Sequence, residues 1–357
     1  MSSQVASRGQ NASASRSAHV GRPFSNRSDR AACVDIIRHG SKSFYAASRL
    51  LPSAVRFDAM SLYAFCRVSD DLVDDPRATL EAARKLKTRI AAAYAGAPND
   101  HPADRLFADV VHKHAIPEAV PLSMVEGFEW DLTGRGYETI GEVIDYSARV
   151  AGTVGVMMSL LMSRRSERTL ARACDLGVAM QLTNIARDVG EDARNGRCYL
   201  PEVWLRDHGL SSHALIEHPA HSPALGHVVE LLLETADVIN ERALTGIGDL
   251  PSSCQTGVRA AALVYAAIGK QVRRNGYNSI DQRAYTSRLQ KLRLLAGAYL
   301  GRLEQHTCDD APALDEVSYL VEAAVDHQED PRSKAEWMLD LVGRLKQQER
   351  LISSRAS

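Results

Sequence analysis

Apolar residues recur with the spacing of an α-helix along most of this chain, and this period limits its fold more than any other feature. Prolines and glycines separate the periodic segments, as they do where helices begin and end. No segment alternates apolar and polar residues in the manner of a strand. We therefore predict an all-α helical bundle, with one domain over residues 29–350 and a disordered tail over residues 1–28. The predicted helices cover residues 54–74, 80–94, 104–115, 119–131, 140–162, 167–192, 201–208, 224–244, 254–275, 282–306, 313–327 and 331–351.

Composition excludes several classes of protein. The formal net charge of the 357 residues is −1, so no global field attracts nucleic acid. The six cysteines are scattered, which argues against a disulfide framework and favours a cytoplasmic protein with reduced thiols. No segment reaches the roughly 18 apolar residues that span a bilayer. Residues 1–28 are rich in serine and arginine, which is typical of a disordered tail and also of a transit peptide.

A first cluster of aspartates ends the predicted helix at 54–74. Asp70 and Asp74 are four residues apart, as are Asp71 and Asp75, so each pair shares one helix face. Carboxylates in this arrangement repel each other, and at the C-terminal end of a helix they also oppose the helix dipole. A helix tolerates this cost more readily if a cation lies between the carboxylates. Arg67 lies on nearly the same face, and its guanidinium could bind phosphate oxygens. An ordinary solvated acidic helix end is the alternative interpretation.

A second oxygen-bearing ridge lies on the predicted helix at 167–192. Asn184, Asp188 and Asp192 follow one another at intervals of four residues, with Gln181 one turn earlier and Arg187 adjacent. The opposite face of this helix is apolar, and a polar ridge on a buried helix is costly unless it finds partners. An ordinary amphipathic helix is again the alternative. If the two ridges face each other across a bundle, they could hold Mg²⁺ ions around a diphosphate and promote its departure from an allylic substrate.

The sequence resembles a known family, the squalene/phytoene synthases, from about residue 36 to residue 295. The resemblance rests on a Ser-x-Ser-Phe segment, a first aspartate-rich motif, a glycine-containing helix and a second aspartate-rich motif, at residues 40–45, 63–74, 146–155 and 181–201. It implies an isoprenoid-synthase helical bundle with a central cavity. It also implies a prenyltransferase of carotenoid and isoprenoid biosynthesis that joins two prenyl diphosphates head to head.

The resemblance further implies the substrate and the cofactor. We expect two geranylgeranyl diphosphates to form phytoene through prephytoene diphosphate, with Mg²⁺ or Mn²⁺ as the cofactor. A C30 enzyme is the alternative, which would convert two farnesyl diphosphates to presqualene diphosphate, squalene or dehydrosqualene. No glycine-rich dinucleotide loop follows a strand, so we expect no NADPH. The greasy product suggests transient contact with a membrane surface.

Residue roles follow from the same resemblance. The implied metal ligands are Asp70, Asp74, Asn184, Asp188 and Asp192. The implied substrate-binding residues are Ser41, Ser43, Phe44, Arg67, Tyr137, Gln181, Arg187 and Arg283. The implied catalytic residues are Asp70, Asp74, Asp188, Asp192 and Tyr265, and for Tyr265 and Arg283 only the spacing supports the assignment.

Three interpretations stay open. Gly152 and Gly155 lie inside a predicted helix, where they allow either substrate or another helix to approach the backbone closely. Met157 and the neighbouring Leu160 and Leu161 could line a prenyl tunnel or pack in the core. A non-catalytic helical assembly factor is the alternative of another class, although such a protein would be expected to lose its metal ligands.

Overall fold

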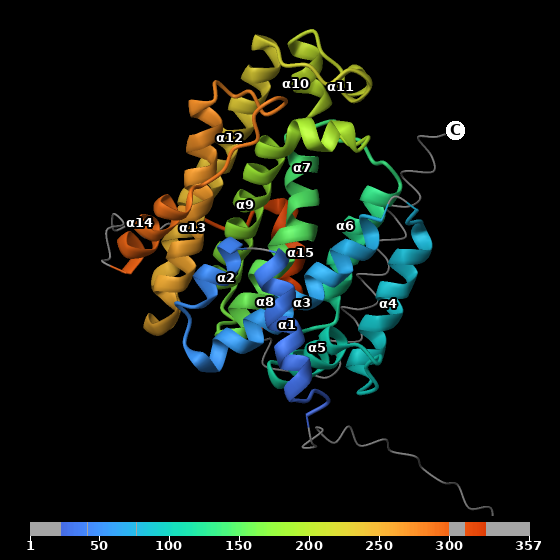
Figure 1. Ribbon diagram of the computed structural model, residues 1–357, viewed down its shortest axis with the longest axis vertical. Coiled ribbons are helices and arrows are strands. Elements are labelled where there is room, and N and C mark those ends of the chain that lie inside the picture. Colours follow the sequence, from blue (N-terminus) through green and yellow to red (C-terminus); the bar gives the residue numbers. More distant parts are fainter. Residues whose placement is uncertain (1–22, 41, 76, 300–310, 326–357) are drawn as a thin grey trace, which may run out of the picture.

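The computed structural model describes residues 23–40, 42–75, 77–299 and 311–325 (Figure 1). Within these residues every regular element is a helix and no strand occurs, which confirms the predicted fold class. The elements are α1 (Arg27–Gly40), α2 (Lys42–Ser48), α3 (Ser53–Val73), α4 (Leu80–Tyr94), α5 (Pro102–Lys113), α6 (Ala119–Leu132), α7 (Ile140–Ser147), the π-helical turn η1 (Ala148–Gly152), α8 (Thr153–Leu161), α9 (Glu167–Arg194), α10 (Glu202–Asp207), α11 (Ser212–Glu217), α12 (Pro223–Thr245), the 3₁₀ turn η2 (Gly246–Asp249), α13 (Ser252–Arg274), α14 (Arg288–Tyr299) and α15 (Asp315–Ala324).

Short polar residues begin several helices, and a glycine ends one. The hydroxyl of Thr79 accepts the backbone N–H of Glu81 at 3.3 Å before α4, and that of Ser222 accepts the N–H of Leu225 at 3.1 Å before α12. Such caps satisfy N–H groups that have no partner inside the helix. After α13, Gly276 has a φ of +64°, the left-handed conformation expected at the cap predicted there.

The N-terminal boundary lies earlier than predicted. α1 begins at Arg27, and the chain is already held before it, because the N–H groups of Phe24 and Ser25 donate to Asp109 at 2.8 and 3.1 Å. The tail boundary drawn at residue 28 is therefore a few residues too late. The remainder of the predicted tail, residues 1–22, and the predicted helix at 331–351 lie outside the described residues.

Two long predicted helices have different limits, and three helices, α1, α2 and α11, were not among those predicted. Residues 140–162 form α7, η1 and α8 instead of one uniform helix. α14 begins at Arg288 and not at residue 282, because tertiary contacts hold the preceding segment: the N–H of Gly190 donates to the carbonyl of Ser279 at 3.1 Å. The short α11 follows the cap formed by Ser211.

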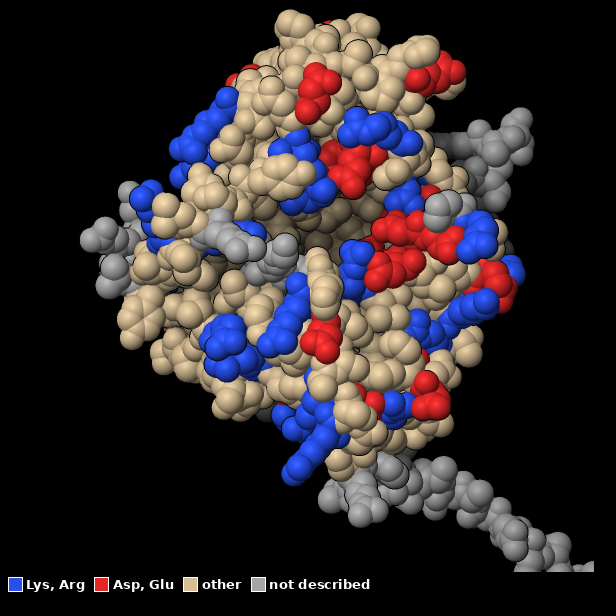
Figure 2. Space-filling model, viewed as in Figure 1, with Lys and Arg blue, Asp and Glu red and all other residues tan. Residues whose placement is uncertain are grey.

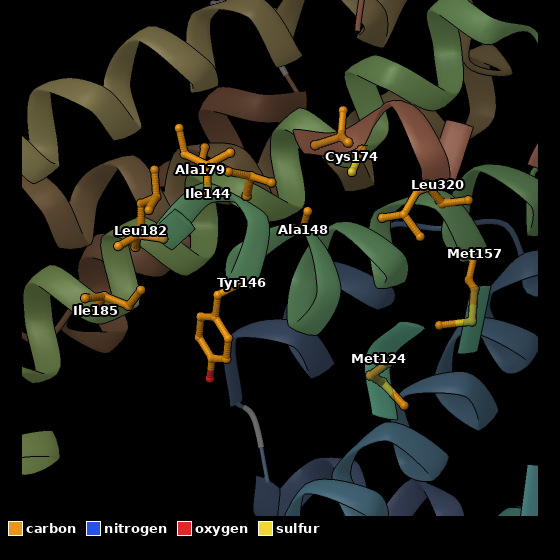
Figure 3. Close-up of a cluster of buried hydrophobic side chains, with 14 of the residues drawn as sticks. Met124, Ile144, Tyr146, Ala148, Met157, Cys174, Ala179, Leu182, Ile185 and Leu320 are labelled. Carbon is orange, nitrogen blue, oxygen red and sulfur yellow. The ribbon is translucent and has the colours of Figure 1, made fainter. Parts of the chain in front are cut away.

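The helix α9 is the central element, and it packs against α8, α12, α13 and α15 (Figure 1). Figure 3 shows part of the resulting core, where Met124, Met157, Leu182 and Leu320 come from four different helices. Met157 is fully buried in this cluster, and the adjacent Leu160 and Leu161 are buried as well. For these side chains the structure favours core packing over a tunnel lining.

Glycines let α8 and η1 approach α9 at backbone distance. A Cβ on Gly155 would lie 2.8 Å from the carbonyl carbon of Ala173, and a Cβ on Gly177 would lie 2.7 Å from that of Ala151. Real Cβ atoms do not approach backbone so closely. Gly152 also faces α9, against the sulfur of Cys174. The structure therefore decides the open question about Gly152 and Gly155 in favour of helix–helix packing.

Candidate active site

The first aspartate cluster occupies the C-terminal end of α3. Arg67 donates to Asp70 at 3.2 Å and also pairs with Asp71, so its guanidinium lies along the acidic face of its own helix. Burial raises the pKa of Asp70 to about 6, with a further contribution from the Asp74 carboxylate, and Arg67 opposes the shift. Arg67 thus compensates only part of the negative charge at the end of α3, where Asp74 and Asp75 pair with Arg197 and Arg77 instead.

The second cluster lies along the last turns of α9. Arg187 donates to Asp188 through Nε at 2.8 Å, and Arg283 reaches the same carboxylate at 2.8 Å from the segment after α13. Arg283 also pairs with Glu191 at 3.0 Å. Burial, together with the charges of Asp188 and Glu191, raises the pKa of Asp192 to about 8. Asp188 is therefore well compensated, whereas one turn later Asp192 is not.

The two clusters face each other. Arg197, in the loop after α9, donates to Asp74 of α3 at 2.9 Å and so joins the two motifs directly. The charge of Asp131, at the end of α6, contributes to the raised pKa of both Asp70 and Asp192. Figure 2 shows acidic and basic side chains gathered around a hollow in this face of the molecule.

Asp131 and the tyrosines around it were not predicted as site residues, apart from Tyr137. The two carboxylate oxygens of Asp131 accept hydrogen bonds from the hydroxyls of Tyr146 at 2.9 Å and Tyr199 at 2.8 Å. Tyr137 lies beside both rings, and its buried hydroxyl has no hydrogen-bond partner in the described part of the chain. Figure 3 shows the hydroxyl of Tyr146 directed away from the apolar core. The sequence did contain a signal that could have identified Asp131 as a site residue. Its carboxylate opposes the dipole at the C-terminal end of a predicted helix, just as the aspartates of the first cluster do.

Replacing Asp131 with asparagine is expected to change how stability depends on pH. Burial raises the pKa of Asp131 to about 6, above the unfolded value of about 3.9. The folded wild type therefore binds an extra proton between these values and loses about 3 kcal/mol of stability as pH rises through them. Asparagine does not titrate, so Asp131→Asn should gain stability relative to wild type as the pH rises from about 3.5 to 6.5. Urea unfolding of both proteins measures this, and parallel pH curves would contradict it.

The oxygen donors of the two helices suit a hard divalent cation. Asn184 has a buried Oδ1 with no hydrogen-bond partner among the described residues, and it lies one turn before Asp188. Carboxylate and amide oxygens are the ligands that Mg²⁺ and Mn²⁺ prefer. Within the described residues no three Asp, Glu, His or Cys side chains are close enough to hold a metal by themselves. The residues present thus fit an oxygen-ligated cation, and metal binding by them stays a prediction.

The other predicted substrate-binding residues lie in different surroundings. Ser41 and the side chain of Ser43 lie outside the described residues. Phe44 stacks on Tyr63 with 4.6 Å between the ring centroids, two turns of α3 before the first cluster. Gln181 accepts a hydrogen bond from the Asn184 amide at 3.3 Å, on the ridge where it was expected.

Tyr265 lies on α13. It is half-buried and packs against the hydrophobic core. Its catalytic role stays a prediction, because the structure adds no contact with the aspartates to the spacing on which the assignment rests.

A pocket of 380 Å³ lies beside the second cluster. Its lining includes Arg187, Asp188, Glu191, Arg283 and Tyr285. Charged groups from α9 and from the segment before α14 therefore share one cavity. This geometry suits an anionic ligand that displaces one carboxylate partner from an arginine.

The helical fold and the two facing aspartate motifs define an isoprenoid-synthase type of enzyme. A sequence profile of the squalene/phytoene synthases matches residues 37–290, so the chain belongs to that family of prenyltransferases. A phytoene synthase of Cereibacter sphaeroides is 44% identical over 338 residues, which cover 90% of this chain and 95% of the relative. A 15-cis-phytoene synthase of a Paracoccus species is 41% identical over 274 residues, which cover 73% of this chain and 88% of the relative.

A solved structure supports the same family. A dehydrosqualene synthase crystallised with a ligand superposes with a TM-score of 0.71 at 30% identity, covering 77% of this chain and 98% of that protein. The resemblance inferred from the four motifs is thereby confirmed. In the described part of the chain no helix has the length and apolar character needed to cross a bilayer.

Proposed function

We propose that this chain condenses two molecules of geranylgeranyl diphosphate head to head, through prephytoene diphosphate, to phytoene, with release of diphosphate. The observation that carries the proposal is that two aspartate motifs, each with its own arginine, are joined through the hydrogen bond from Arg197 to Asp74. Relatives named phytoene synthase at 44% and 41% identity support a C40 product.

The divalent cation is part of this proposal. The residues that would hold Mg²⁺ or Mn²⁺ are Asp70, Asp74, Asn184, Asp188 and Asp192. The bound cations would neutralise the departing diphosphate. This role agrees with the partly uncompensated charge at both helix ends.

Arginines from both clusters would bind the diphosphate oxygens. Arg187 and Arg283 converge on Asp188, and Arg67 lies along the end of α3. A guanidinium presents a planar fork of donors that matches phosphate as well as carboxylate oxygens. Each arginine can therefore transfer from its carboxylate to the substrate without a large movement of the backbone.

An allylic carbocation survives only where water is excluded. Phe44 and Tyr63 form an aromatic wall one turn before Arg67, and Gly40 packs against the Tyr63 hydroxyl. A Cβ on Gly40 would lie 3.1 Å from that hydroxyl oxygen. We place the first part of the prenyl chain against this wall.

A product assay tests the proposed function. Purified protein would receive geranylgeranyl diphosphate or farnesyl diphosphate, with Mg²⁺ or Mn²⁺ and without NADPH. We expect phytoene from the C20 substrate, identified by extraction and mass spectrometry. A C30 product from farnesyl diphosphate alone would assign the chain to the alternative suggested by the dehydrosqualene synthase neighbour. No product from either substrate would favour the non-catalytic assembly factor.

The expected location follows from the same chemistry. We propose a cytoplasmic protein that contacts a membrane transiently, because a C40 hydrocarbon partitions into lipid and not into water.

A further inference from the structure

Exposed apolar side chains concentrate on one short stretch of this protein. Six large hydrophobic residues are exposed in the described part of the chain, and four of them lie between residues 285 and 299. Their exposed fractions are 69% for Tyr285, 58% for Leu289, 62% for Leu292 and 77% for Tyr299. Soluble proteins rarely gather large apolar side chains at their surface without a partner.

Three of these side chains form a stripe on α14. Leu289, Leu292 and Tyr299 follow at intervals of three and seven residues, so they share one helix face, which we call the α14 stripe. On the opposite face Ala298 is buried, where α14 packs against α13. A surface helix normally turns a polar face outward. Because α14 is apolar on both faces, its outer face is suited to being covered.

The charge around the stripe indicates what covers it. The described residues 282–299 contain four basic residues and no acidic residue. Arg293 is exposed and lies at the edge of the stripe. Apolar side chains bordered by basic ones suit the interface of an anionic membrane, where the apolar groups enter the acyl region and the cations face the headgroups. A second copy of the chain would bring the same positive charge against itself, which disfavours a dimer through this face.

The α14 stripe begins four residues after Tyr285, a residue that lines the candidate active-site pocket. Tyr285 lines the same 380 Å³ pocket as Asp188, and Arg283, two residues earlier, pairs with Asp188 and Glu191. A protein docked through α14 would therefore hold this pocket at the lipid surface.

We propose that the α14 stripe docks the protein on anionic membranes. If the proposed function holds, docking lets prenyl chains exchange between the pocket and the lipid. The docking itself does not require substrate, so it can be tested separately from the activity.

The test uses a matched pair of single substitutions. Leu292→Glu places a carboxylate on the α14 stripe, and Val238→Glu places one at an equally exposed position on α12, since Val238 is 61% exposed. Both variants change the net charge equally. Sedimentation with vesicles of phosphatidylglycerol and phosphatidylcholine, and with vesicles of phosphatidylcholine alone, measures binding. We expect wild type and Val238→Glu to bind the anionic vesicles and Leu292→Glu to bind them at least about tenfold more weakly.

Several outcomes would overturn the proposal. The wild type could stay in the supernatant with anionic vesicles, or it could bind neutral vesicles as tightly as anionic ones. Both variants could also lose binding to the same extent. A dimer in wild type that Leu292→Glu dissociates, seen by light scattering, would assign the stripe to a second copy. Circular dichroism checks that both variants are folded. Turnover of detergent-dispersed substrate should be unchanged in both, which separates failure of docking from failure of the proposed function.

Discussion

Replacing Asp188 with alanine is expected to abolish turnover and leave the protein folded. Asp188 is the carboxylate on which Arg187 and Arg283 converge, and it is the middle member of the ridge formed with Asn184 and Asp192. Its loss would remove a predicted metal ligand and leave the two arginines without their shared partner. Removal of one preorganised charged group at a site of developing charge costs about 10²–10³ in kcat, and a lost metal ligand should cost at least as much. Steady-state product formation measures the effect.

The matched control is Asp281→Ala. Asp281 lines the same pocket as Asp188, but it is exposed and its carboxylate accepts a hydrogen bond from Asn278 at 3.0 Å. We expect this variant to keep nearly full activity. Circular dichroism and melting temperature should show that Asp188→Ala is as folded as the control. Near-normal turnover by folded Asp188→Ala would contradict the metal-site assignment.

The parts of the site that lie within one helix were predictable from sequence. Asp70 and Asp74, like Asp188 and Asp192, lie four residues apart, and a helix converts that spacing into one face whatever the rest of the fold does. The helices themselves were predictable for the same reason. Their apolar period is a local property, and so are the caps, such as Gly276 after α13.

The parts assembled from distant segments were not predictable. Asp131 ends α6, Tyr146 belongs to α7 and Tyr199 follows α9, so only the folded chain brings their side chains together. The start of α14 is a second example. Residues 282–287 fit a helical period, yet the neighbouring contact of Ser279 with Gly190 and the pairing of Arg283 with Asp188 hold the segment outside the helix. Tertiary contacts override local propensity there.

The close packing at the glycines of α8 and α9 was only partly predictable from the sequence. The sequence shows that a helical glycine costs about 1 kcal/mol relative to alanine, so a compensating contact is expected. It does not show which surface makes the contact. In the structure the compensation is reciprocal: Gly155 faces Ala173 of α9, and Gly177 faces Ala151 of η1. Each backbone enters the gap left by the other helix's missing side chain.

Replacing Gly155 with alanine is therefore expected to destabilise the protein strongly, although alanine favours helix. The new Cβ would lie 2.8 Å from the carbonyl carbon of Ala173, which belongs to rigid backbone and cannot rotate away. α8 and α9 would have to separate, and α9 carries the second aspartate cluster. Overpacking of this kind costs about 3 kcal/mol or more when backbone must move. In a chain of this size that loss should lower the thermal midpoint by at least about 4 °C.

Gly248→Ala controls for the change of residue type. Gly248 lies in η2 and does not adopt a positive φ, and a Cβ added there would meet no heavy atom within 4 Å among the described residues. Its replacement should leave the midpoint unchanged or raise it slightly, because alanine restricts the unfolded chain. If Gly155→Ala instead melted within about 1 °C of Gly248→Ala, α8 and α9 would have room for a side chain between them. Space beside Gly155 would then reopen the interpretation that substrate, and not a helix, approaches this backbone.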